Sequence, residues 1–207
     1  MLHRLSRRGF LGASAAALSI GRATLSRAQE VQDAPSGPVR VHRIYVGRPR
    51  QAWPKPAFDP RAEMERIELA LREMKPALTG VELTGGELVQ TPEEAARAVA
   101  AARQADGILL IHLTLGVLSL MQKIVETGKP TVVFSQPFSG HEWMFVRQWQ
   151  REGRRIVLLA TSDMGEIAPA VRLLRVPALM ARSRIVAVPG KLDGSAPACS
   201  PEKIQAT

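Results

Sequence analysis

Short apolar runs rich in β-branched residues alternate with longer amphipathic stretches from Val39 onward. Two of these runs, GILLIHL and TVVFS, are apolar without any alternation, which is typical of strands covered on both faces. A weaker run, at 81–89, is interrupted by Gly85-Gly86. We therefore predict strands at 39–46, 81–89, 107–113, 131–135, 155–160 and 184–188.

Helical spacing and capping residues predict helices between these strands. The helix after Pro60 carries apolar residues at intervals of three and four, and Thr91-Pro92-Glu93-Glu94 combines a cap, a first-turn proline and acids that complement the helix dipole. The last helix contains Pro177, where we expect a bend. The predicted helices cover 60–74, 91–104, 118–126, 140–150 and 165–182.

Alternating strands and helices indicate right-handed βαβ crossovers. The predicted fold is α/β, with a mainly parallel Rossmann-like sheet and helices on both faces, over residues 39–190. The chain of 207 residues is 45% apolar and only 4% aromatic, so its core must consist mostly of aliphatic side chains.

The N-terminus has the pattern of a twin-arginine signal peptide. Arg7 and Arg8 precede Phe10 and Leu11, a short run of small and apolar residues follows, and cleavage is predicted after Ala28. The alternative is a mildly basic amphipathic helix. The signal interpretation implies the Tat translocase as a partner and export, for example to the periplasm. A short linker is expected at 29–38.

The net charge of +9 does not indicate nucleic-acid binding. Five of the 28 basic residues and none of the 19 acidic residues lie in residues 1–28, so the remaining chain has a net charge of about +4. Its charges are mixed along the chain, and no nucleic-acid motif is present, so we expect no nucleic acid as a partner. The lone Cys199 excludes a disulfide within the chain and a cysteine-based zinc site.

The segment after 190 contains a second helix start. Ser200, Pro201 and Glu202 provide a cap, a proline and an acid, yet the sequence ends at Thr207, barely one turn later. We expect 191–207 to be the start of a truncated second domain, or alternatively a tail on a complete domain.

Candidate ligand-binding residues follow the predicted strands, because open parallel sheets bind ligands beyond the carboxyl ends of their strands. The segment after the fourth strand is the most polar of these. The candidates at this edge are Arg48, Thr114, Gln136, Ser139, His141, Glu142, Trp143 and Asp163.

Each candidate side chain also has a purely structural interpretation. His141 can bind a substrate hydroxyl and Trp143 can stack on a sugar face, but Ser139 can instead cap a helix, with Glu142 in its first turn and Trp143 in the core.

Both a ligand-binding and a structural interpretation also exist for Arg48, Asp163 and His112. Arg48 can hold an anionic or polyhydroxyl ligand, or pair with a surface acid. Asp163 can accept sugar hydroxyls, although helix capping explains it more simply. His112, inside an apolar strand, is predicted to be a hydrogen-bonded core residue.

Several signatures of catalysis are absent from the sequence. It contains no G-x-G-x-x-G after the first strand, no Walker loop, no H-E-x-x-H and no G-x-S-x-G. We therefore assign no catalytic residue and no metal ligand within this chain.

A family resemblance rests on five segments: the GRP loop after the first strand, GILLIHL, VVFSQPFSGHE, SDMGEI and ACSPEKI. Together they resemble the N-terminal part of L-fucose/L-arabinose isomerase-like proteins. The resemblance implies an aldose–ketose isomerase that uses a divalent cation, usually manganese. It also implies a Rossmann-like N-terminal domain that contributes to substrate and oligomer contacts. The family's metal ligands lie in later domains, and its members are cytoplasmic, unlike a protein with an export signal.

These observations lead to two functional hypotheses. In the first, the chain is the N-terminal domain of an exported sugar-isomerase-like protein, inactive alone and binding no cofactor by itself. In the second, it is a complete exported module that binds a carbohydrate or similar solute without catalysis. Both expect a small sugar or polyol as ligand, with a homo-oligomer as a possible assembly.

Overall fold

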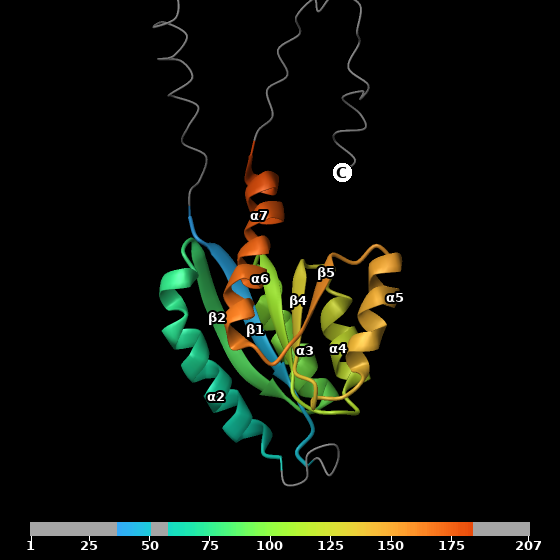
Figure 1. The fold of residues 1–207 in the computed structure, drawn as a ribbon. Helices are drawn as coiled ribbons and strands as arrows, with labels where there is room; N and C mark the ends of the chain where they lie inside the picture. Colours follow the sequence, from blue (N-terminus) through green and yellow to red (C-terminus); the bar gives the residue numbers. More distant parts are fainter. Residues whose placement is uncertain (1–36, 51–57, 184–207) are drawn as a thin grey trace, which may run out of the picture.

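The computed structural model describes residues 37–50 and 58–183, which form one five-stranded parallel sheet (Figure 1). Its strands are β1 (Val39–Val46), β2 (Val81–Val89), β3 (Gly107–His112), β4 (Thr131–Ser135) and β5 (Ile156–Ala160), in the order β2-β1-β3-β4-β5. All four strand pairings are parallel, which confirms the predicted α/β fold class. The predicted signal peptide, the sixth strand at 184–188 and the tail lie outside the described residues.

Helices cover both faces of the sheet. One face packs against α2 (Pro60–Glu73), α6 (Ile167–Leu173) and α7 (Arg175–Arg182), and the other against α3 (Pro92–Ala101), α4 (Leu118–Val125) and α5 (Val146–Arg151) (Figure 1). Alternate residues of one strand enter the two cores, as in β3, where Leu109 belongs to the core on the side of α2, α6 and α7 and Leu110 to the core on the other side. The uninterrupted apolar strands of the sequence are therefore buried from both sides.

Local capping explains where the helices begin. The Asp59 carboxylate accepts a hydrogen bond from the Arg61 amide at the start of α2, and Thr91 and Glu94 form a reciprocal capping box at the start of α3. Four short 3-10 helices complete the described secondary structure: η1 (Lys75–Ala77), η2 (Ala102–Gln104), η3 (Glu142–Phe145) and η4 (Met164–Glu166).

The bend predicted near Pro177 is present as a break one turn before the proline. The predicted helix at 165–182 consists of η4, α6 and α7, with the break between the two α-helices at Leu174. Pro177 has no N–H to donate to the carbonyl of Leu173, and its ring collides with that carbonyl in a regular helix. The break therefore lies one turn before the proline. There the Leu174 amide donates to the carbonyl three residues back, Val171 O at 3.1 Å, and not to the carbonyl four residues back as in a regular α-helix.

Strand β2 contains a bulge at the glycine pair noted in the sequence. The pairing register with β1 shifts between Arg43 and Ile44, and Gly85 has φ +71°. A Cβ on Gly85 would lie 2.6 Å from Cε1 of His42, so only glycine fits beside this imidazole.

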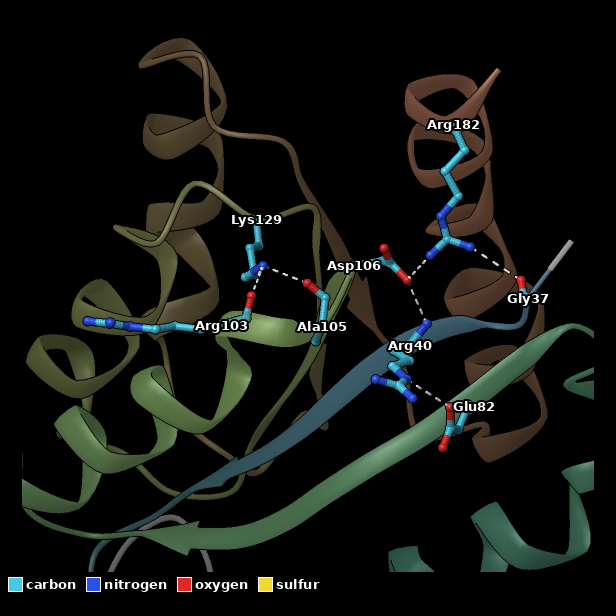
Figure 2. A network of polar contacts seen from close by, with 8 residues as sticks. All are labelled: Gly37, Arg40, Glu82, Arg103, Ala105, Asp106, Lys129 and Arg182. Carbon is cyan, nitrogen blue, oxygen red and sulfur yellow. Dashed lines mark hydrogen bonds and ion pairs between the residues drawn. The ribbon is translucent and has the colours of Figure 1, made fainter. Parts of the chain in front are cut away.

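A polar network fastens the end of α7 to the start of β1 (Figure 2). Arg182 donates to Oδ2 of Asp106 at 2.6 Å and to the carbonyl of Gly37 at 3.2 Å. The same Asp106 oxygen accepts the Arg40 amide at 2.8 Å. The end of α7 is thereby held at the amino end of the sheet, over its middle strands.

Candidate ligand-binding site

The strand order places a topological switch point between β1 and β3. The chain moves from β1 outward to β2, and from β3 in the opposite direction to β4 and β5, so the segments after β1 and β3 diverge at the carboxyl edge. These segments are joined by a hydrogen bond from the Arg48 amide to Oγ1 of Thr114, at 2.7 Å. The predicted location for a ligand site therefore exists in the fold.

Beneath this edge lies a buried polar network centred on His112. Its Nδ1 is 2.9 Å from Oγ of Ser135, and its Nε2 is 2.8 Å from the carbonyl of Thr114 and 3.3 Å from Oε2 of Glu142. A carbonyl only accepts, so Nε2 carries a hydrogen, and in the neutral imidazole Nδ1 accepts from the Ser135 hydroxyl. His112, Ser135 and Glu142 are 1%, 2% and 5% exposed.

Glu142 links the segment after β4 to the start of α4. Its Oε1 accepts hydrogen bonds from the amides of Gly116 and Val117, the latter at 3.2 Å. Burial alone would raise the pKa of Glu142, but the adjacent His112 side chain and the hydrogen bond from the Gly116 amide outweigh it and lower the pKa from 4.5 to about 2. The positive end of the α4 dipole favours the same charged form. Glu142 is thus an ionised carboxylate that occupies the amides at the start of α4.

Two glycines make this contact sterically accessible. Gly116 has φ +83°, which presents its amide to the carboxylate. Gly140 has φ +133°, and a Cβ there would lie 2.6 Å from Oε2 of Glu142 and 2.9 Å from Cα of Leu115. A side chain at position 140 would therefore separate the two loops.

The order hydroxyl, imidazole, carboxylate is also that of an activated serine nucleophile. Here all three side chains are buried, and the amides that would stabilise an oxyanion are occupied by Glu142. In this conformation no substrate reaches the Ser135 hydroxyl. The network therefore holds three loops in position, and we derive no reaction from it.

An exposed polar layer lies outside the buried network. Arg48 and His141 are exposed, as is Gly116 between them in chain order. The Arg48 guanidinium extends over the loop after β3, since a Cβ on Gly116 would lie 3.0 Å from its Nη1. Arg48 and His141 are therefore the predicted residues that a ligand at the switch point can reach.

Besides Glu142, three of the predicted ligand-binding residues are buried within the protein. Thr114 is fully buried and its hydroxyl accepts the Arg48 amide. The amide of Gln136 bridges Glu63 and Arg66 of α2, with its nitrogen 2.8 Å from Glu63 and its oxygen 2.9 Å from Arg66 when oriented to satisfy both. Ser139 is 1% exposed.

The predicted helix start after β4 requires correction. The structural interpretation that Ser139 caps a helix is wrong, because η3 starts after His141 and has no side-chain cap. The first turn is a 3-10 helix, and α5 begins only at Val146. The change in helical period alters which aromatic residue faces inward.

The structural interpretation of Trp143 as a core residue is also wrong. Trp143 is 40% exposed, whereas Trp149, which our sequence analysis did not single out, is 5% exposed and packs in the core beneath β4 and β5. The exposed indole lies along a groove with Leu158 and α5, on the β5 side of the molecule.

Two other structural interpretations are confirmed. Asp163 follows β5 and caps η4, accepting the Gly165 amide at 2.8 Å. His112 is a buried, hydrogen-bonded histidine, as predicted, although the sequence did not indicate its pairing with Glu142. Asp163 follows the edge strand β5, which β4 separates from β3 and the switch point.

Neither a metal site nor a membrane span occurs in the described part of the chain. Within 37–50 and 58–183 no three His, Cys, Asp or Glu side chains are grouped so that they could hold a metal ion. The residues present therefore do not fit the manganese ion that the resemblance implies, and we derive no step through it. None of the described helices is long and apolar enough to cross a membrane. Known protein-family models give no match to this chain, and curated proteins give no significant match.

Proposed function

We propose that this domain binds a small sugar or polyol at the switch point between β1 and β3. The observation that carries the proposal is the convergence of the segments after β1, β3 and β4, with Arg48 and His141 exposed on a rigid buried base. The carboxyl edge at a topological switch point is the usual ligand site of open parallel sheets.

The chemistry of the exposed layer suits hydroxyl groups. A guanidinium offers several N–H donors in a fixed plane, and an imidazole offers one donor and one acceptor. Adjacent hydroxyls of a sugar both donate and accept, so they match this pair of side chains. The buried network of His112, Ser135 and Glu142 fixes the loops before binding, which reduces the entropy cost of ordering them around a ligand.

We further propose that the chain belongs to an exported sugar-isomerase-like protein as its N-terminal domain. The five segments that resemble such proteins and the Arg7-Arg8 leader support this assignment. The family's metal ligands lie in other domains, so the chain alone is expected not to interconvert aldoses and ketoses. Turnover of any aldose by the purified chain with manganese would contradict this expectation.

Calorimetric titration of the chain with a panel of pentoses and deoxyhexoses tests ligand binding. We expect heat of binding with at least one sugar, and an affinity loss of about tenfold or more in Arg48→Ala and in His141→Ala, because each removes hydrogen bonds to the ligand. The matched control is Ser162→Ala, an exposed residue after β5, which should leave the affinity unchanged. No heat with any sugar would refute the binding proposal.

Export is tested independently of binding. Replacing Arg7 and Arg8 together by lysine should retain the protein in the cytoplasm of a host with a twin-arginine translocase, while the unaltered chain is exported. Equal distribution of the two forms between cell fractions would refute the signal-peptide assignment.

The second candidate is a binding module without any catalytic partner domain. The absence of catalytic motifs from the sequence favours it. The coding sequence downstream of Thr207 distinguishes the two candidates: an in-frame domain with clustered Glu, Asp and His supports the isomerase-like protein, and its absence supports the module.

A further inference from the structure

The two edges of the sheet are built differently. Edge strand β2 carries Glu82 and Glu87 and contains the bulge at Gly85. Charged side chains and bulges of this kind prevent a sheet edge from pairing with another strand. Edge strand β5 has the sequence IVLLA, with no charge, proline or bulge between Ile156 and Ala160. Within 37–50 and 58–183, the β5 edge therefore lacks the protection that the β2 edge has.

Among the residues that the structure describes, no strand pairs with the outward backbone groups of β5. Thr131 N donates to Arg155 O at 2.8 Å, so the odd-numbered residues of β5 bond to β4 and the even-numbered residues face outward. Ile156 is satisfied, since its amide donates to Arg154 O and its carbonyl accepts Nε2 of Gln150 at 2.8 Å. Within the described residues, no hydrogen bond uses the outward groups of Leu158 and Ala160.

Apolar side chains extend this edge into a larger surface. Val157 is 43% exposed on one face of the sheet. On the other face an open groove of about 720 Å³ separates Leu158 from α5, and Trp143 and Met144, 40% and 59% exposed, line it. The end of α7 does not cover this surface, because Arg182 holds it over β1 (Figure 2).

We propose that the β5 edge is a dimer interface, on which β5 of a second copy of this chain pairs in the antiparallel direction. In the register that pairs Leu158 with Ala160 of the partner subunit, a twofold axis passes between Leu159 and Leu159 of the partner subunit. Each outward amide and carbonyl of these two residues then gains a partner. The two five-stranded sheets become one continuous sheet.

Charge complementarity supports a second copy as the occupant. Arg154 and Arg155 precede β5, while Asp163 and Glu166 follow it. In an antiparallel pair the start of one strand meets the end of the other, and this register places Arg155 opposite Asp163 of the partner subunit. Each interface thus contains this oppositely charged pair twice, which favours the antiparallel arrangement over a parallel one.

Sedimentation equilibrium of the full chain over a range of concentrations tests the dimer. Ala160→Pro removes the outward amide without affecting the β4 ladder, so the dimer dissociation constant should rise by more than about tenfold. Ala160→Ser keeps the amide and should leave the constant unchanged. A chain that stays monomeric at hundreds of micromolar would overturn the proposal, as would a dimer that tolerates Ala160→Pro.

Charge reversal gives a test that does not depend on proline. Arg155→Glu and Asp163→Arg should each weaken the dimer, and the double variant should recover most of the affinity, because the pair is restored with opposite polarity. Additive weakening in the double variant would count against this register. Slow hydrogen exchange at Leu158 and Ala160 in the dilute monomer would overturn the proposal, because another part of the chain would then cover the edge.

Discussion

The buried carboxylate of Glu142 provides the sharpest test of the site architecture. Replacing it with glutamine preserves shape and still offers an oxygen to the amides of Gly116 and Val117. The new amide group, however, faces Nε2 of His112, which already carries a hydrogen for Thr114 O. Two donors then oppose each other in a buried position, so we expect Glu142→Gln to destabilise the fold.

The pKa of Glu142 sets the expected size of this effect. A carboxyl with a pKa of about 2 when folded and 4.5 when unfolded contributes about 3 kcal/mol to stability at neutral pH. Because the folded pKa is the lower one, this contribution is complete above pH 4.5 and is lost as the pH falls toward 2. The difference in unfolding free energy between wild type and Glu142→Gln should therefore be about 3 kcal/mol at pH 7 and shrink below pH 4.5.

Urea unfolding followed by circular dichroism measures this difference. If the unfolding free energy falls by about 2 kcal/mol per molar of urea, the urea midpoint of Glu142→Gln at pH 7 should lie roughly 1.5 M below that of the wild type. The control is Glu152→Gln, an exposed glutamate whose substitution should change stability by less than about 0.5 kcal/mol. Coincident midpoints for wild type and Glu142→Gln, or a gap that stays constant down to pH 3, would refute the reasoning.

Four further substitutions test other parts of the structure. Gly140→Ala should cost about 2 kcal/mol in thermal unfolding, because it places a Cβ against Leu115 and Glu142 in a strained backbone conformation. Trp149→Ala should cost about 3–5 kcal/mol and Trp143→Ala less than about 1 kcal/mol, and equal losses would contradict their assigned burial. Arg182→Ala should cost about 1 kcal/mol and accelerate hydrogen exchange selectively in α7.

Most of the fold follows from local patterns in the sequence. Uninterrupted apolar runs such as TVVFS identify buried parallel strands, and Thr91-Pro92 marks a helix start, because these signals depend on neighbouring residues only. The strand order depends on packing between distant segments. No periodicity in the sequence indicates that β3 pairs with β1 on the side opposite β2.

The candidate site was predictable in location and less so in detail. The rule for carboxyl edges identified the loops that contain Arg48 and Glu142, but not the contact between Glu142 and His112, which are 30 positions apart. The inward-facing tryptophan was missed for a related reason. If an α-helix ran from residue 140, Trp143 would point toward the core. The segment instead begins with the 3-10 helix η3, which has fewer residues per turn and so changes the direction of the side chains that follow. Val146 and Trp149 therefore face the core.

The site separates into a buried layer that stabilises the loops and an exposed layer that can bind a ligand. Glu142 and His112 belong to the first layer, and Arg48 and His141 to the second. Arg48→Ala should therefore weaken ligand binding about tenfold while leaving the urea midpoint within error, because an exposed side chain contributes little to folding. Glu142→Gln should lower the midpoint at pH 7, yet bind the ligand when conditions keep the variant folded. If Arg48→Ala destabilised the domain as much as Glu142→Gln does, the arginine would be part of the buried scaffold, and the exposed edge would lose its principal ligand-binding group.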